Sequence, residues 1–121
     1  MIDHLALNVS DVAASRAFYE AALAPLGYGV VMEWEGRFAF GPPARPILFI
    51  GRRDPVHTGL HLAFEAKDRP AVDAFHAAAL AAGAHDNGSP GMRTQYHPHY
   101  YGAFVLDPDG NNAEAVCHTP A

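Results

Sequence analysis

Eight histidines equal in number the lysines and arginines of this 121-residue chain, and imidazoles are common metal ligands and general bases. Two of them, His4 and His61, lie 57 residues apart in segments that match each other. At this offset eleven residue pairs are identical without a gap, including Asp11 with Asp68. Gene duplication is the simplest explanation. We therefore expect two similar half-domains, with His4 and His61 at equivalent places.

A glutamate near the end of the chain can join the two imidazoles. In segment 112–118, Glu114, Val116 and His118 alternate with small residues, which fit under a helix. Glu114 then shares the side of the sheet that carries the histidines. His4, His61 and Glu114 would form a metal site with open positions for a substrate. The alternative is that each is a hydrogen-bonded polar residue on a half-solvated sheet face.

The segment 92–101 is dense in aromatic, imidazole and hydroxyl groups. His97 or His99 could serve as acid-base groups, and the tyrosines could hydrogen-bond a substrate oxygen. The alternative is that these rings pack the loop onto the sheet or form a dimer contact. We expect this segment to contribute His97 and Tyr101 as catalytic residues, with Tyr96, Tyr100 and His99 as further candidates beside the substrate.

Three further residues are candidates for substrate binding. Arg93 could meet an anionic substrate, or it could be a solvated charge. Trp34 and Phe38, on middle strands of the first half, could form an apolar wall of the same site. The alternative for each of these two aromatics is ordinary core packing. His118 shares the face of Glu114 and is a weaker candidate beside the ligands.

Each half is expected to run strand, helix and then three strands. The first half has strands at 4–9, 28–35, 37–40 and 46–51, and a helix from an N-cap at Ser10 or Asp11 to about Ala24. The second half has strands at 60–66, near Ala84, at 100–106 and at 112–118, and a helix capped by Asp68. Glycine and proline runs at 41–43 and 88–91 mark breaks, and 107–110 is a turn between antiparallel strands.

Composition excludes several classes of protein. With 50% apolar and 17% charged residues, the chain is too hydrophobic to be disordered. A formal net charge of −5 and scattered arginines exclude a basic nucleic-acid surface. No apolar run is long enough for a membrane helix, and the N-terminus lacks the features of a signal peptide. A single cysteine excludes an internal disulfide, so we expect a cytoplasmic protein. From its charge and the lack of a membrane helix, we expect no nucleic-acid or membrane partner.

The sequence resembles the vicinal oxygen chelate superfamily, which includes glyoxalase I, extradiol dioxygenases, fosfomycin-resistance thiol transferases and bleomycin-binding proteins. The resemblance covers nearly the whole chain. It rests on segments 3–11, 15–19, 59–64 and 104–112 together with Glu114. It implies an α+β fold of two βαβββ modules that form a cup-shaped mixed sheet, here a single domain 1–121 with modules at 1–56 and 57–121.

The resemblance also implies a function. His4, His61 and Glu114 fall on the ligand positions of one divalent metal ion, which would be Fe, Mn, Ni or Zn. The expected protein is a homodimeric lyase or dioxygenase whose small substrate chelates the metal through vicinal oxygens. Glyoxalase I usually supplies a fourth, acidic ligand from the last strand of the first half, but segment 46–51 contains no acidic residue. The alternative is a metal-free protein that sequesters a small molecule, as bleomycin-resistance proteins do.

Overall fold

A computed structural model describes residues 1–120, so that Ala121, the last residue of the second expected module, lies outside it. The first module contains β1 (Leu5–Val9), α1 (Val12–Leu23), a short 3₁₀ helix η1 (Ala24–Leu26), β2 (Gly29–Trp34), β3 (Arg37–Gly41) and β4 (Leu48–Arg52). The second contains β5 (His61–Glu65), α2 (Arg69–Ala81), β6 (His85–Met92), β7 (Tyr101–Leu106) and β8 (Asn112–Cys117). The expected order of two βαβββ units is confirmed.

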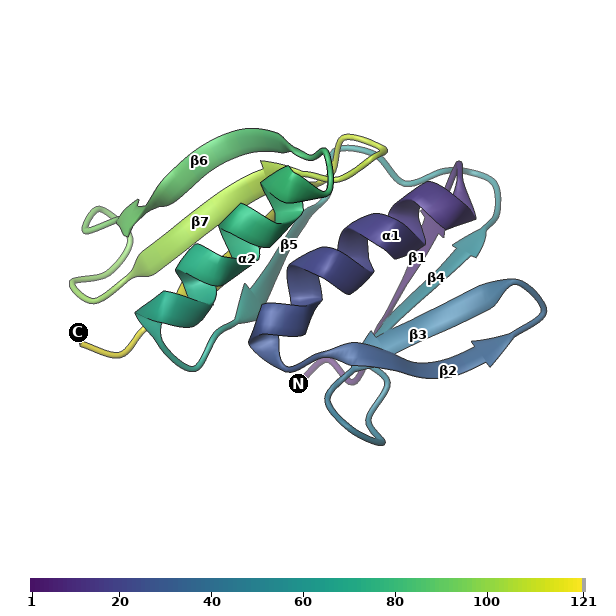
Figure 1. Ribbon diagram of the computed structural model, residues 1–121, viewed down its shortest axis with the longest axis horizontal. Coiled ribbons are helices and arrows are strands. Elements are labelled where there is room, and N and C mark those ends of the chain that lie inside the picture. The colour runs from purple at the N-terminus through teal and green to yellow at the C-terminus, as the bar shows by residue number, and fades with distance from the viewer. Residues whose placement is uncertain (121) are drawn as a thin grey trace.

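Each module forms its own four-stranded mixed sheet. The strand orders are β1-β4-β3-β2 and β5-β8-β7-β6, so the two sheets have the same topology. In each sheet the first strand runs parallel to the last, and the other neighbours are antiparallel. The two helices lie side by side on one side of the molecule, and each covers one face of its sheet (Figure 1). Within the described residues, no helix covers the opposite face of either sheet.

Equivalent aspartates begin the two helices. Asp11 accepts a hydrogen bond from the Ala14 amide at 3.1 Å, and Asp68 accepts one from the Ala71 amide at 2.9 Å. Each carboxylate satisfies an amide that the first helical turn leaves without a partner. Since the two caps are 57 residues apart, the internal repeat predicted from the sequence is present in the structure.

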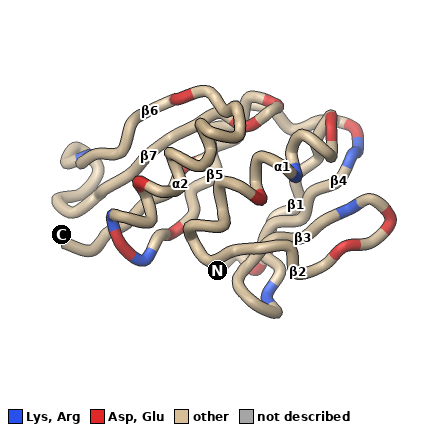
Figure 2. Tube along the Cα trace, viewed as in Figure 1, with Lys and Arg blue, Asp and Glu red and all other residues tan. Residues whose placement is uncertain are grey.

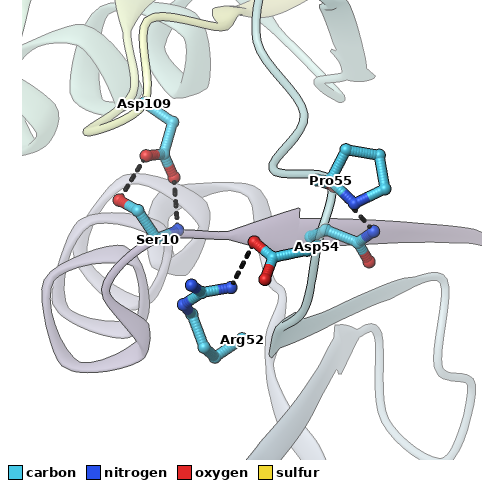
Figure 3. Close-up of polar contacts among 6 residues, drawn as sticks. Ser10, Arg52, Asp54, Pro55 and Asp109 are labelled. Atoms are coloured by element: carbon cyan, nitrogen blue, oxygen red, sulfur yellow. Dashed lines mark hydrogen bonds and ion pairs between the residues drawn. The ribbon is translucent and has the colours of Figure 1, made fainter.

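The turn between β7 and β8 fastens the second module to the first. Asp107 accepts a hydrogen bond from the Tyr19 hydroxyl of α1 at 2.7 Å, and both residues are buried. Burial and the neighbouring Asp107 carboxylate raise the pKa of Tyr19 well above its usual value. On the surface, Asp109 from the same turn accepts hydrogen bonds from the Ser10 amide and hydroxyl (Figure 3). The two modules are therefore joined by polar contacts as well as by the packing of α1 on α2.

One strand differs from its prediction. The sequence suggested a short strand near Ala84 and a break at 88–91, whereas β6 continues through His85–Met92 with two register shifts around Gly88. Gly88 adopts a φ of +152°, and a Cβ there would lie 2.7 Å from the Phe104 ring. Pro90 is tolerated because β6 is an edge strand, where a missing backbone donor costs little. The bulges therefore absorb residues that usually end a strand.

Candidate functional site

His61 and Glu114 meet on the open face of the second sheet. His61 begins β5 and Glu114 lies in the middle of the adjacent strand β8, where Glu114 is fully buried. The His61 Nε2 atom lies 2.6 Å from Glu114 Oε1. The alternating pattern of β8 is as expected, since Ala113, Ala115 and Cys117 belong to the core under the helix. Two of the three predicted metal ligands are thus in direct contact.

Tyr100 contacts the second oxygen of the Glu114 carboxylate. Its hydroxyl donates a hydrogen bond to Glu114 Oε2, and burial followed by this bond raises the pKa of the Tyr100 phenol. Gly102 makes room for the pair, because a Cβ there would lie 3.1 Å from both Glu114 Oε2 and Tyr100 Cε1. The sequence alone assigns Tyr100 no specific partner. Its alternation with the inward Tyr101 could have indicated that it shares the face of Glu114.

His4 lies on the open face of the first sheet, apart from this pair. Its Nδ1 atom is 2.7 Å from the neighbouring Asp3 carboxylate, and its ring centroid is 5.1 Å from that of Phe49 in β4. Within residues 1–120, no three histidine, cysteine, aspartate or glutamate side chains lie close enough to hold a metal ion. His4 and His61 nevertheless line a common cleft of about 570 Å³ between the two modules. One chain therefore assembles two of the predicted ligands and places the third across a cleft.

Strand β4 contains no acidic residue that could be a fourth metal ligand, as expected from the sequence. Its open face presents Phe49 and Gly51, while Leu48 and Ile50 point into the core. Phe49 contacts both the His4 ring and the Trp34 ring, with centroids 5.1 and 5.8 Å away. The β4 side chain that contacts His4 is thus aromatic and not acidic.

The turn 93–100 lies next to Glu114 through Tyr100. The Tyr96 and His118 rings flank the Tyr100 ring, with centroids 5.1 and 5.3 Å away. The His97 ring lies 5.6 Å from that of His118, and its Nδ1 accepts a hydrogen bond from the His99 amide. The predicted candidates Tyr96, His97 and His99 thus lie in the turn next to Tyr100.

Arg93 is held beside the same open face. Its guanidinium donates to the Ser89 carbonyl at 2.7 Å and lies 5.4 Å from the Phe104 ring centroid. Phe104 in turn lies 6.1 Å from the His61 ring. Phe104 therefore lies near both Arg93, the predicted substrate-binding cation, and the His61–Glu114 pair.

Two predicted site residues face the helices instead. The Tyr101 hydroxyl donates to Asp73 of α2 at 2.6 Å, and this bond raises the pKa of Tyr101. Phe38 is buried in the core, with the Arg16 guanidinium of α1 4.2 Å from its ring centroid. In each strand, the neighbouring residues point to the open face of the sheet and this residue points to the helix side. Phe38 thus has the position expected from the alternative of ordinary core packing.

Comparisons with known proteins agree with this architecture. The family model of the Glyoxalase/Bleomycin resistance protein/Dioxygenase superfamily matches residues 1–115, and the chain belongs to this superfamily. A glyoxalase/bleomycin resistance protein from Albidiferax ferrireducens T118 is 31% identical, with a TM-score of 0.82 over 96% of this chain and 97% of that one. The curated proteins contain no match to this chain.

More distant structures share the fold. A glyoxalase/bleomycin resistance protein/dioxygenase family enzyme from Burkholderia phytofirmans PsJN is 18% identical, with a TM-score of 0.74 over 98% of both chains. Lactoylglutathione lyase from Agrobacterium tumefaciens is 22% identical, with a TM-score of 0.69 over 97% of this chain and 92% of that one.

Within residues 1–120, no helix has the length and apolar character of a membrane span.

Proposed function

We propose that this protein is a divalent-metal-dependent enzyme that acts on a small molecule with two neighbouring oxygens able to chelate the metal. His61 and Glu114 would hold the ion from one module, and His4 would be the third ligand. When bound, the metal supplies Lewis-acid polarisation of the substrate oxygens and a template that orients them. The reaction is of the lyase or dioxygenase type found in this superfamily.

The observation that carries the proposal is the buried carboxylate of Glu114. Burying an ionised carboxylate is costly unless a cation or several donors compensate for it. Within residues 1–120, no lysine or arginine lies within ion-pair distance of Glu114, and its partners are His61 and Tyr100. An imidazole and a carboxylate are a suitable donor pair for Fe, Mn, Ni or Zn. The donor set therefore fits a divalent ion that would neutralise Glu114.

The remaining residues of this face would act on the substrate. His97 is proposed as the acid-base group, since the turn that carries it lies against Tyr100. Arg93, Tyr96 and His99 are proposed to contact polar parts of the substrate. Trp34 is proposed to contact an apolar part from the first module. For Tyr101, a catalytic role would require its hydroxyl to leave Asp73.

We further propose that a homodimer completes the site. Within residues 1–120, the strands of each module form a sheet of their own, and no hydrogen-bonded pairing joins β1 to β5. The apolar residues Ile2 and Leu5 beside His4 are 81% and 37% exposed. A second copy that covers this region would remove them from water and bring its own His61 and Glu114 to His4.

A second function, sequestration of a small molecule without metal, is favoured by one observation. His61 and Glu114 already satisfy each other, and His4 is engaged by Asp3. A protein with these contacts could use its open faces for binding alone. Metal content separates the two functions.

The test is the metal content of protein purified without chelators or added metal. We expect near-stoichiometric Fe, Mn, Ni or Zn, lost in His61→Ala and Glu114→Ala but retained in His85→Ala, whose histidine is exposed at the start of β6. Oxygen uptake with catechols, compared with loss of the methylglyoxal–glutathione hemithioacetal, then separates dioxygenase from lyase chemistry. Metal-free protein that binds no added divalent ion at micromolar concentration would contradict the proposed function and favour sequestration.

A further inference from the structure

The open face of the first sheet carries two arginines beside an aromatic floor. A cleft of about 160 Å³ in this face is lined by Trp34 and Phe49 and by Arg37 and Arg53. Arg37 is the first residue of β3 and Arg53 follows the last residue of β4, and Figure 2 shows basic residues in both regions. His4, the proposed third metal ligand, lines the same cleft. The cleft therefore combines an apolar surface, two positive charges and a proposed metal ligand.

The two guanidinium groups lack acidic partners. Within residues 1–120, no carboxylate lies within ion-pair distance of Arg37 or Arg53. The neighbouring Arg52 differs, because it donates to Asp54 at 2.9 Å (Figure 3). Arg52 does not line this cleft; it lines a hollow beside α1, which Arg37 also borders. Positive charge without a partner on one face of the sheet is what an anionic ligand needs.

Gly51 fixes the course of Arg37 across the sheet. Arg37 and Gly51 lie on adjacent strands, and a Cβ at Gly51 would lie 3.1 Å from Arg37 Cγ and 3.4 Å from Cδ. The absence of a side chain there lets the stem of Arg37 cross β4. The head group then reaches the cleft that Arg53, two residues further along the chain, also lines.

The register of the strands sets a distance between this charge and His4. Asn8 pairs with Gly51, which lies beside Arg37 of the adjacent strand, while Ala6 pairs with Phe49 two residues nearer to His4. His4 and Asn8 are four residues apart along one extended strand, which is about 13 Å. His4 therefore enters this cleft from the start of β1, while Arg37 and Arg53 enter it from the side of Asn8 and Gly51.

We propose that this cleft binds the anionic end of an elongated ligand, a carboxylate or a phosphate-type group, whose apolar or aromatic middle lies on Trp34 and Phe49. If the proposed metal-dependent function is correct, on which this identification of the substrate rests, the chelating oxygens are at the far end of the same molecule. The substrate class is thus an aromatic or apolar anion that carries its vicinal oxygens away from its charge.

Trp34 provides a direct test, because it is the only tryptophan in the chain and lines the cleft. Metal-free full-length protein is titrated with 4-phenylbutyrate, 3-phenylpropylphosphonate and neutral 4-phenylbutanamide, and Trp34 fluorescence is recorded. We expect saturable binding of one or both anions, with the amide about tenfold weaker. The comparison of the two anions identifies whether the site prefers a carboxylate or a phosphonate.

Matched variants then locate the charge. Arg37→Gln and Arg53→Gln should each weaken anion binding about tenfold, and Arg52→Gln should leave it unchanged. Arg37→Lys should lie between the wild type and Arg37→Gln, since it keeps the charge without the planar fork. Equal affinity for anion and amide, or equal losses in Arg52→Gln and Arg37→Gln, would overturn the proposal. Because no metal is present, a failure of the proposed metal site would leave this binding result unchanged.

Discussion

At the scale of single residues, Glu114 is held by three neighbours with different tasks. His61 contacts one carboxylate oxygen, Tyr100 donates to the other, and Gly102 leaves the space in which this second contact forms. A carboxylate held at both oxygens has little freedom to rotate, so one oxygen stays directed at His61. Groups that orient a metal ligand in this way affect metal affinity without touching the metal.

Tyr100→Phe is therefore expected to weaken metal binding. The variant keeps the ring between Tyr96 and His118 but removes the hydroxyl that positions Glu114. Loss of such an outer contact typically costs about 10- to 100-fold in metal affinity. The measurement is a competition titration against a chromophoric chelator at fixed pH. Thermal unfolding of the metal-free protein is recorded in parallel.

Tyr96→Phe is the matched control for this prediction. Tyr96 contacts Tyr100 ring to ring and is 63% exposed, so removal of its hydroxyl leaves Glu114 untouched. Its metal affinity should equal that of the wild type. A positioning role for Tyr100 would be refuted if both variants bound metal as tightly as the wild type. A lower melting temperature with unchanged metal affinity would assign Tyr100 a purely structural role.

At the scale of elements, alternation along single strands could be predicted from the sequence, but the faces of some side chains could not. The sequence predicts a first helix cap at Ser10 or Asp11, and the structure shows Asp11. The second cap at Asp68 and the inward alanines of β8 also follow from local patterns and are confirmed. The sequence predicts Tyr101 as a catalytic residue and Phe38 as a substrate-binding residue, whereas strand pairing places them towards α2 and α1. A single strand shows two faces but does not say which one a helix covers, and that depends on its neighbours.

The length of β6 and the position of His4 depend on information that a local pattern lacks. Gly88 and Pro90 predict a break, and only the pairing with β7 shows that bulges on an edge strand accommodate them. The internal repeat correctly placed His4 and His61 at equivalent positions of two modules. Equivalence under the repeat does not determine the distance between the two, because that depends on how the modules pack.

The contact between α2 and β6 predicts a pH dependence of stability. His76 Nε2 lies 2.8 Å from Asp86 Oδ1, and this hydrogen bond, followed by the one from the Gly88 amide, lowers the pKa of Asp86 from 3.8. The folded protein therefore holds this proton less tightly than the unfolded chain. The stabilisation from Asp86 is present above its unfolded pKa of 3.8 and is lost as the pH falls through the lower folded value.

The corresponding experiment compares Asp86→Asn with the wild type in urea unfolding between about pH 5 and pH 2. The variant should lose less free energy of unfolding over this interval, because it lacks the carboxylate that takes up the proton. Glu65→Gln is the control, since Glu65 is exposed and has no ion-pair partner within residues 1–120. An identical acid dependence in Asp86→Asn and the wild type would contradict the assignment.

At the scale of the whole molecule, helix packing and open sheet faces lie on opposite sides. The packing of α1 on α2 and the Tyr19–Asp107 bond hold the modules together from the helix side. In the part of the chain that the structure describes, no helix covers the faces that carry His4 on one sheet and His61 with Glu114 on the other. In a dimer, the first sheet of one protomer could face the second sheet of the other. Every site would then combine His4 from one protomer with His61 and Glu114 from the other.

Subunit mixing tests this arrangement. His4→Ala and His61→Ala are expected to bind little metal alone, but a mixed dimer would contain one site with all three ligands intact. After joint refolding, about half of randomly formed dimers are mixed, so about a quarter of the sites should regain metal. Mixing His61→Ala with Glu114→Ala should restore none, because those two ligands come from the same protomer. A first mixture as empty as this control, in protein shown to exchange subunits, would place all three ligands within one chain.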